Sequence, residues 1–148
     1  MARFVTGGTS VTVVPSATLP AGTLYGAAAR QLTVVELAVF NTTTTAVIVG
    51  LCRTTTAGTV GAATTIGKLD IADLQTPTGV GYLNHQSGGP TLTGLPYTAL
   101  LGAAVGAAYC FTFGGKGLVI PAVANNGLGI YIPEGTGQHL RWYAVWDE

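Results

Sequence analysis

Short runs of β-branched and aromatic residues recur along this chain, separated by Gly, Pro, Thr and Asn, with almost no helical periodicity. Runs of this length between turn residues are typical of strands. We expect strands at 9–14, 32–40, 46–53, 109–113, 118–120, 129–132 and 140–146, and one irregular strand within 54–65. The pattern predicts an all-β fold, a single-domain β-sandwich over residues 1–148 that is jelly-roll-like, with long loops and little or no helix.

The two strands expected at 32–40 and 46–53 are apolar on both faces, which indicates the interior of a sandwich. The polar run 41–45 between them predicts a hairpin with a loop of four or five residues. Simple alternation places Glu36 on one strand face with Val34 and Ala38. A carboxylate in that position requires a polar partner or an interface.

Alternation along 140–146 places Trp142 and Trp146 on the core face and Tyr143 on the opposite face. We nevertheless expect both ends of the chain to contact a partner. Residues 1–8 are predicted to form an extended N-terminal arm that precedes the sandwich. The predicted contact residues are Arg3, Phe4, Tyr143 and Trp146.

Charged residues are scarce, at 8% of the chain against roughly 25% in an ordinary domain. The formal net charge is zero and the basic residues are scattered singly, so a nucleic-acid partner is disfavoured. The longest apolar stretch, 99–108, is about half the ~20 residues that a membrane helix needs, so a membrane partner is disfavoured too. With two lysines in all, neither within an expected strand, strand edges lack their usual protection. We therefore expect a homo-oligomer, most simply a homotrimer.

Candidate chemistry is sparse, and we expect no catalytic set, no cofactor and no metal. His139 reads as a turn residue, and His85 reads as part of a solvated loop that can reach a ligand. Asp70 and Asp73 read as turn residues that cap their own backbone, although their spacing would also suit a shared cation or an acid–base task. The two cysteines, Cys52 and Cys110, lie in apolar runs and read as buried free thiols, with a disulfide as the alternative.

From residue 32 to its end the chain resembles the capsid decoration, or cement, proteins of tailed bacteriophages. The resemblance lies in texture, carried by the segments 36–45, 48–53, 67–70, 116–121, 135–138 and 146–148. It implies a trimeric β-sandwich that clamps the major capsid protein on the surface of the virion capsid, and it carries over no catalytic residue.

We therefore expect a non-enzymatic structural virion protein that binds and stabilises a capsid shell. The alternative is a receptor- or glycan-binding tail-fibre or tail-tip module, read out by the loop 82–90 with Asn84, His85 and Gln86. A third possibility is a hydrolase with a site that no familiar motif marks.

Overall fold

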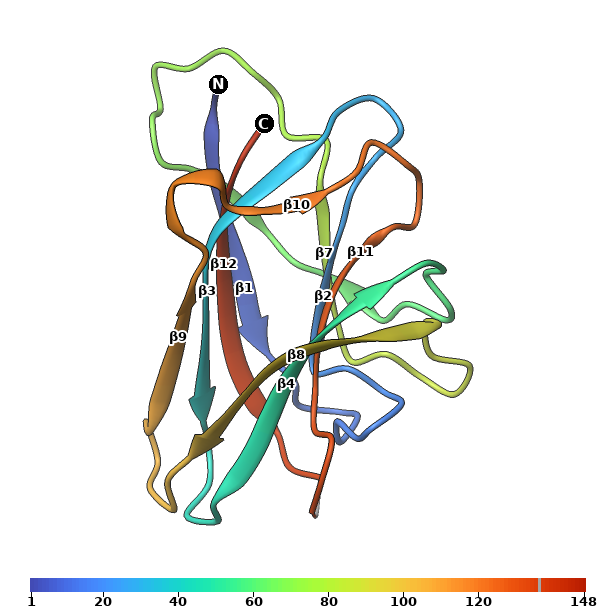
Figure 1. Ribbon diagram of the computed structural model, residues 1–148, viewed down its shortest axis with the longest axis vertical. Coiled ribbons are helices and arrows are strands. Elements are labelled where there is room, and N and C mark those ends of the chain that lie inside the picture. The colour runs from blue at the N-terminus through green and yellow to red at the C-terminus, as the bar shows by residue number, and fades with distance from the viewer. Residues whose placement is uncertain (136) are drawn as a thin grey trace.

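The computed structural model describes residues 1–135 and 137–148, together with every side chain in these ranges except those at positions 95 and 96. It consists of two six-stranded antiparallel sheets (Figure 1). The strands are β1 (Arg3–Thr9), β2 (Gly22–Tyr25), β3 (Leu32–Asn41), β4 (Val47–Thr54), β5 (Ala62–Ala63), β6 (Ile66–Lys68), β7 (Val80–Leu83), β8 (Leu92–Leu101), β9 (Ala108–Thr112), β10 (Leu118–Ile120), β11 (Gly127–Tyr131) and β12 (Leu140–Asp147). One short 3₁₀ turn, η1 (Gly114–Lys116), follows β9.

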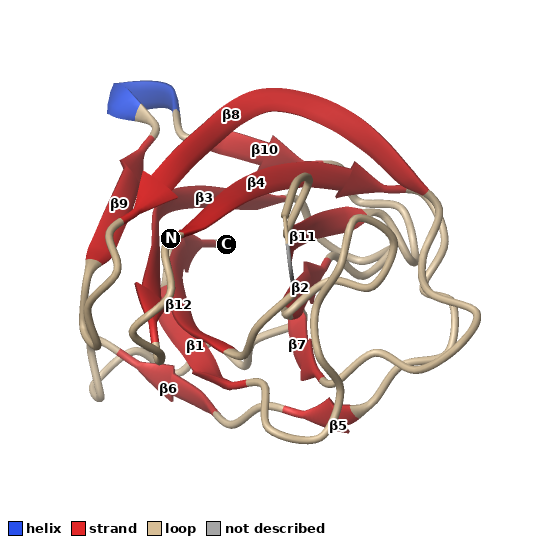
Figure 2. Ribbon diagram, turned by 90° about the horizontal axis from the view of Figure 1, so that it is seen from below, coloured by secondary structure: helices blue, strands red, loops and turns tan. Residues whose placement is uncertain are grey.

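The strand order is that of a jelly roll. Sheet A has the order β10-β3-β12-β1-β6, with β9 also paired to β3, and sheet B has the order β5-β7-β2-β11-β4-β8. The first strand, β1, pairs with the last, β12, and β2 pairs with β11. β3 then pairs with the other side of β12, and β4 with the other side of β11. These pairings are those of a ribbon of strands folded over on itself. Figure 2 shows both sheets curving around a shared interior. The predicted all-β, jelly-roll-like sandwich is confirmed.

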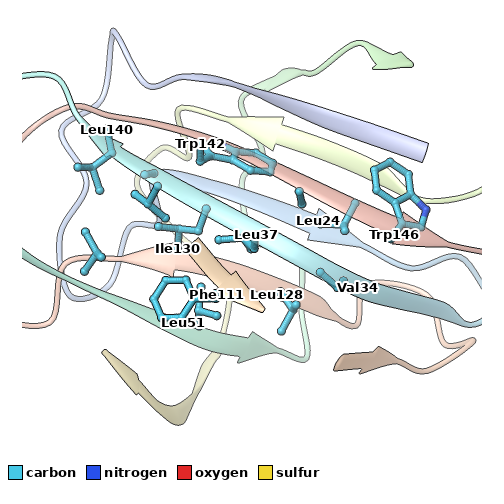
Figure 3. Packing of buried hydrophobic residues seen from close by; sticks show 14 of the residues in the cluster. Leu24, Val34, Leu37, Leu51, Phe111, Leu128, Ile130, Leu140, Trp142 and Trp146 are labelled. Carbon is cyan, nitrogen blue, oxygen red and sulfur yellow. The ribbon is translucent and has the colours of Figure 1, made fainter. Parts of the chain in front are cut away.

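The core lies between the sheets and is almost entirely aliphatic and aromatic (Figure 3). Trp142 and Trp146 of β12 both face into it, as the alternation along the last strand predicts. Gly22 of β2 leaves the space that the Trp142 indole fills, because a Cβ at Gly22 would overlap that ring. The large Trp142 side chain of sheet A therefore packs over Gly22 of sheet B, which has no side chain.

A β-bulge in β3 changes which way Glu36 points. The register with β12 skips Val35, so that Val145 lies opposite Glu36 while Trp146 lies opposite Val34. An extra residue on one strand reverses the alternation beyond it. Val34 is consequently buried on the inner face, whereas Glu36 lies on the outer face. The predicted sharing of one face by Glu36 and Val34 is wrong for this reason.

Two further local predictions are wrong. The β3 and β4 strands do not form a hairpin, because the connection 42–46 crosses from sheet A to sheet B. Buried Asn41 supports this crossing: its amide nitrogen donates to the Thr45 and Gly102 carbonyls at 2.7 and 2.8 Å. The expected strand 9–14 is wrong, because Thr9 ends β1 and residues 10–14 are a loop although they are rich in valine.

The predicted N-terminal arm is also wrong. Residues 3–9 form β1, which lies inside sheet A between β12 and β6. β1 pairs with β12 along its whole length, from Arg3 opposite Asp147 to Thr9 opposite Arg141. An apolar Phe4 at an alternate position makes this segment a core strand rather than a free arm.

Candidate interaction surfaces

The four predicted contact residues divide into two pairs. Phe4 and Trp146 lie opposite each other on the inner face of sheet A, and each is 0% exposed, with ring centroids 5.8 Å apart. Their prediction as contact residues is wrong, because a side chain enclosed by the core cannot touch another protein. Arg3 and Tyr143 lie on the outer face of the same sheet, and there the Arg3 guanidinium pairs with Asp147 at 2.7 Å.

The outer face of sheet A is nearly uncharged at its centre. Away from the row that holds the Arg3–Asp147 pair, strand register aligns the outward side chains in three rows across the sheet. These rows are Gly67–Val5–Val145–Glu36–Thr112, then Gly7–Tyr143–Ala38–Cys110, and finally Thr9–Arg141–Phe40–Ala108. Among these residues only Glu36 and Arg141 carry charge, so this face offers mainly apolar and small side chains.

Glu36 is held on this face by Tyr143. The Tyr143 hydroxyl donates a hydrogen bond of 2.5 Å to the Glu36 carboxylate. That bond, together with partial burial and the nearby negative charge, raises the pKa of Tyr143 to about 12. The Tyr143 ring also leans toward Phe40, with centroids 6.0 Å apart. The need for a polar partner at Glu36 is thus met within the chain.

A hollow of about 670 Å³ opens on the outer face beside Tyr143. Its walls include Val5, Phe40, Tyr143 and Val105, and glycines at positions 7, 8, 67 and 106 contribute no side chain to fill it. The single charged residue in its lining is Arg141, which is exposed and forms no ion pair within the described part of the chain. The hollow therefore suits an apolar group accompanied by a negative charge.

A second feature is the loop after β6, residues 69–75, which we call the apical loop. It lies near both chain ends, at the upper left of Figure 1. Ile71 and Leu74 are 92% and 93% exposed, and neighbouring Leu69 is 55% exposed. Single exposed aliphatic residues are ordinary, but three within six residues of one loop indicate a binding element.

The apical loop is fixed by hydrogen bonds although its apolar side chains are free. Asp70 and Asp73 each accept a backbone N–H two residues on, from Ala72 at 2.9 Å and from Gln75 at 2.8 Å. Their prediction as turn-capping residues is confirmed. Lys68 donates to the Asp73 carbonyl at 2.8 Å, and the Gln75 side chain donates to the Glu148 carbonyl at 3.0 Å.

The Glu148 carboxylate anchors the segment that follows this loop. It accepts the backbone N–H groups of Thr78 and Gly79 at 2.9 Å each, and the indole N–H of Trp146 at 2.9 Å. The loop is thereby tied to the last strand of sheet A. A loop held at both ends presents Ile71 and Leu74 at a defined spacing.

The third feature is the edge formed by β8 and β9, which sequence reasoning missed. β8 is one of the two edge strands of sheet B, and it runs for ten residues. Tyr97, Leu100 and Tyr109 are 45%, 69% and 47% exposed here. Residues 74–115 contain no Asp, Glu, Lys or Arg, a signal that was legible in the sequence. The long strand edge therefore lacks the charges that normally discourage pairing.

The loop 82–90 leaves only one of its three predicted reader side chains, Gln86, exposed. His85 is 0% exposed, and its Nε2 lies 2.8 Å from the Thr23 hydroxyl. The Asn84 carboxamide oxygen accepts the Val11 and Thr12 N–H groups at 2.8 and 3.2 Å. The prediction of a solvated His85 is wrong, and burial lowers its pKa to about 4.

The other candidate side chains have structural surroundings. His139 precedes β12 as predicted, and its carbonyl accepts the Thr42 hydroxyl at 2.6 Å. Both cysteines are free thiols, but only Cys52 is buried, so the prediction of a buried Cys110 is wrong. Within residues 1–135 and 137–148, no group of three or more His, Cys, Asp or Glu is placed to hold a metal ion. No helix among these residues is long and apolar enough to cross a membrane. Position 136, within the segment 135–138 that contributes to the resemblance, lies outside the described residues.

These features define a jelly-roll β-sandwich with three surface elements suited to binding: the hollow, the apical loop and the β8–β9 edge. Comparisons with protein-family models, with curated proteins and with solved structures find no match to this chain.

Proposed function

We propose that this protein is a non-enzymatic structural component of a tailed-phage virion, which binds the major capsid protein and stabilises the capsid surface. The observation that carries the proposal is the uncharged β8–β9 edge, where Tyr97, Leu100 and Tyr109 are all exposed. The resemblance in texture to cement proteins supplies the capsid as the partner.

The chemistry of this edge favours a permanent contact. Burial of aromatic and aliphatic side chains away from water lowers the free energy by about 25 cal/mol per Å² of apolar surface. Tyrosine is common among residues that dominate protein interfaces. A ten-residue edge strand without charge would also risk uncontrolled pairing if it stayed bare. A permanently bound partner on this edge would bury the apolar side chains and protect the strand from uncontrolled pairing.

The alternative of a glycan-binding tail module has less support. Of its three proposed reader residues, His85 is enclosed and Asn84 is engaged with the backbone of the loop 10–21. Only Gln86 is exposed and free to hydrogen-bond a sugar in this conformation. We therefore retain the capsid as the partner, with the protein acting as a homo-oligomer, most simply a trimer.

The first test is to separate purified virions into heads and tails and quantify this chain in each by mass spectrometry. We expect many copies, confined to heads. A few copies confined to tails, or absence from both fractions, would contradict the proposal.

A second test addresses the edge itself. Leu100→Lys places a charge on an exposed position of β8, so it should leave the fold intact and reduce head occupancy severalfold. Val123→Lys, at a 51% exposed position outside the edge, is the matched control and should bind normally. Because the contact is apolar, raising salt to about 1 M should not release the protein. Equal occupancy by the two variants would contradict this assignment of the edge.

A further inference from the structure

We propose that the apical loop of one copy docks into the hollow on sheet A of a second copy, and that this contact builds the oligomer. The proposal deepens the oligomeric part of the proposed function and does not depend on the capsid. It rests on the properties of two surfaces that the same chain carries.

The apical loop has the properties of an anchor. Ile71 and Leu74 are almost completely exposed, so nearly their whole apolar surface is available for burial. The hydrogen bonds of Asp70, Asp73 and Gln75 fix the backbone between and around them. Binding through a loop that is already ordered avoids the entropic cost of ordering that loop on association.

The hollow has the properties of a receptor for this anchor. Val5, Phe40, Tyr143 and Val105 supply apolar walls, and the glycines leave room between them. Its one charged lining residue, Arg141, has no carboxylate partner among the described residues. In the apical loop the charged neighbour of Ile71 is Asp70, which is exposed. Ile71 and Leu74 would thus enter the apolar part of the hollow, while the Asp70 carboxylate would lie near the Arg141 guanidinium.

The loop does not occupy the hollow of its own chain, since Ile71 and Leu74 remain exposed. β6 connects the two surfaces: Gly67 lines the hollow, and the chain then runs past Phe4 toward the start of β1 before the loop begins. Two different surfaces meeting in this way make a head-to-tail contact. Such contacts close into rings when the rotation between copies permits, and a ring of three is the expected form.

Two variants test the apical loop and the hollow independently. Ile71→Ser with Leu74→Ser removes the anchor at positions that make no core contact. Gly67→Leu fills the hollow, and its Cβ fits because the nearest atom, a Val5 methyl carbon, is 3.4 Å away. The matched controls are Val11→Ser with Val123→Ser, at exposed positions elsewhere, and Gly115→Leu, where a Cβ meets nothing within 4 Å.

The measurement is molar mass by light scattering over a dilution series. We expect the unaltered protein and both controls to show three times the 15.0 kDa of one chain. Each contact variant alone should fall to the mass of one chain. Mixing the two should give the mass of two chains, because one intact loop then meets one intact hollow.

An unaltered protein with the mass of one chain would overturn the proposal, as would a variant that keeps the full mass or a mixture that stays at one chain. These outcomes are separate from the capsid test. A single-chain mass with abundant copies in heads would reject the contact alone, whereas an intact oligomer absent from virions would reject the capsid role alone.

Discussion

The Tyr143 hydroxyl donates a 2.5 Å hydrogen bond to the Glu36 carboxylate on the outer face of sheet A. The contact exists because a bulge at Val35 turns Glu36 outward and brings it opposite Val145, one row from Tyr143. A carboxylate within an otherwise apolar strand is accommodated by this single change of register. The pair borders the hollow, since Tyr143 contributes to its wall.

Removing the charge at Glu36 should lower the pKa of Tyr143. The hydrogen bond to Glu36 is the largest cause of the raised pKa of Tyr143, about 12 against an ordinary 10.0. Glu36→Gln should therefore move that pKa back toward 10, as seen by ultraviolet titration of tyrosinate. Tyr143→Phe, the control, should show a smaller late transition than the unaltered protein, because only Tyr25, whose pKa burial also raises to about 12, is then left to titrate there. Since the folded pKa is the higher one, the contact stabilises the protein fully below pH 10 and ceases to do so as pH rises toward 12. Identical titration curves for Glu36→Gln and the unaltered protein would contradict this assignment.

Replacing Phe4 should destabilise the whole domain. Phe4→Ala removes a ring that is 0% exposed and packed against Trp146, so the free energy of unfolding should fall by about 3–5 kcal/mol. Arg3→Ala, one residue earlier, loses only an exposed ion pair and should cost less than about 1 kcal/mol. Urea unfolding of the two variants provides the comparison. Near-equal midpoints would mean that residues 1–8 behave as an arm after all.

Gly7 and Gly67 should differ sharply in their tolerance of a side chain. A Cβ at Gly7 would overlap the Trp142 carbonyl oxygen and come within 2.7 Å of the Tyr143 Cα, so β1 and β12 would have to separate. We expect Gly7→Ala to lower the free energy of unfolding by about 1–3 kcal/mol. Gly67→Ala, where only a Val5 methyl group is near, should lie within about 0.5 kcal/mol of the unaltered protein. A larger loss of stability in Gly67→Ala than in Gly7→Ala would contradict the open surroundings of Gly67 beside the hollow.

His85 should make the protein sensitive to mild acid. Burial lowers its folded pKa to about 4 from an ordinary 6.5, so the unfolded chain binds a proton first. Stability is then lost as pH falls from 6.5 to 4, by about 3 kcal/mol over the full window. Urea midpoints of the unaltered protein and of His85→Gln should converge as pH falls through this range. Parallel curves would show that His85 is not the group responsible.

The two cysteines should differ in reactivity. Cys110 is exposed on β9, whereas Cys52 is buried, and burial raises the pKa of the Cys52 thiol to about 12. Because the thiolate is the reactive form, a disulfide reagent should modify Cys110 in the native protein and both thiols only after denaturation. Cys110→Ser should abolish the native reaction. Rapid native modification of that variant would contradict the buried position of Cys52.

The apical loop and the hollow could not be predicted from the sequence, for different reasons. Ile71 and Leu74 look like ordinary strand or core residues in the sequence. Only the hydrogen bonds that Glu148 accepts from Gln75, Thr78 and Gly79 show that their loop is held away from the core. The hollow needs residues from β1, β3, β6 and β12 side by side. Register between strands so distant in sequence depends on long-range pairing, which local patterns do not encode.

The sequence by itself determined the fold class, the core face of the last strand and the turn-capping role of Asp70 and Asp73. These follow from local alternation and from side chains that bond their own backbone. The tertiary structure decided that residues 3–9 form a core strand, that Glu36 faces outward and that His85 is enclosed. Each of these depends on which strand lies opposite, and that choice is made by packing across the sandwich rather than by the residues of one segment.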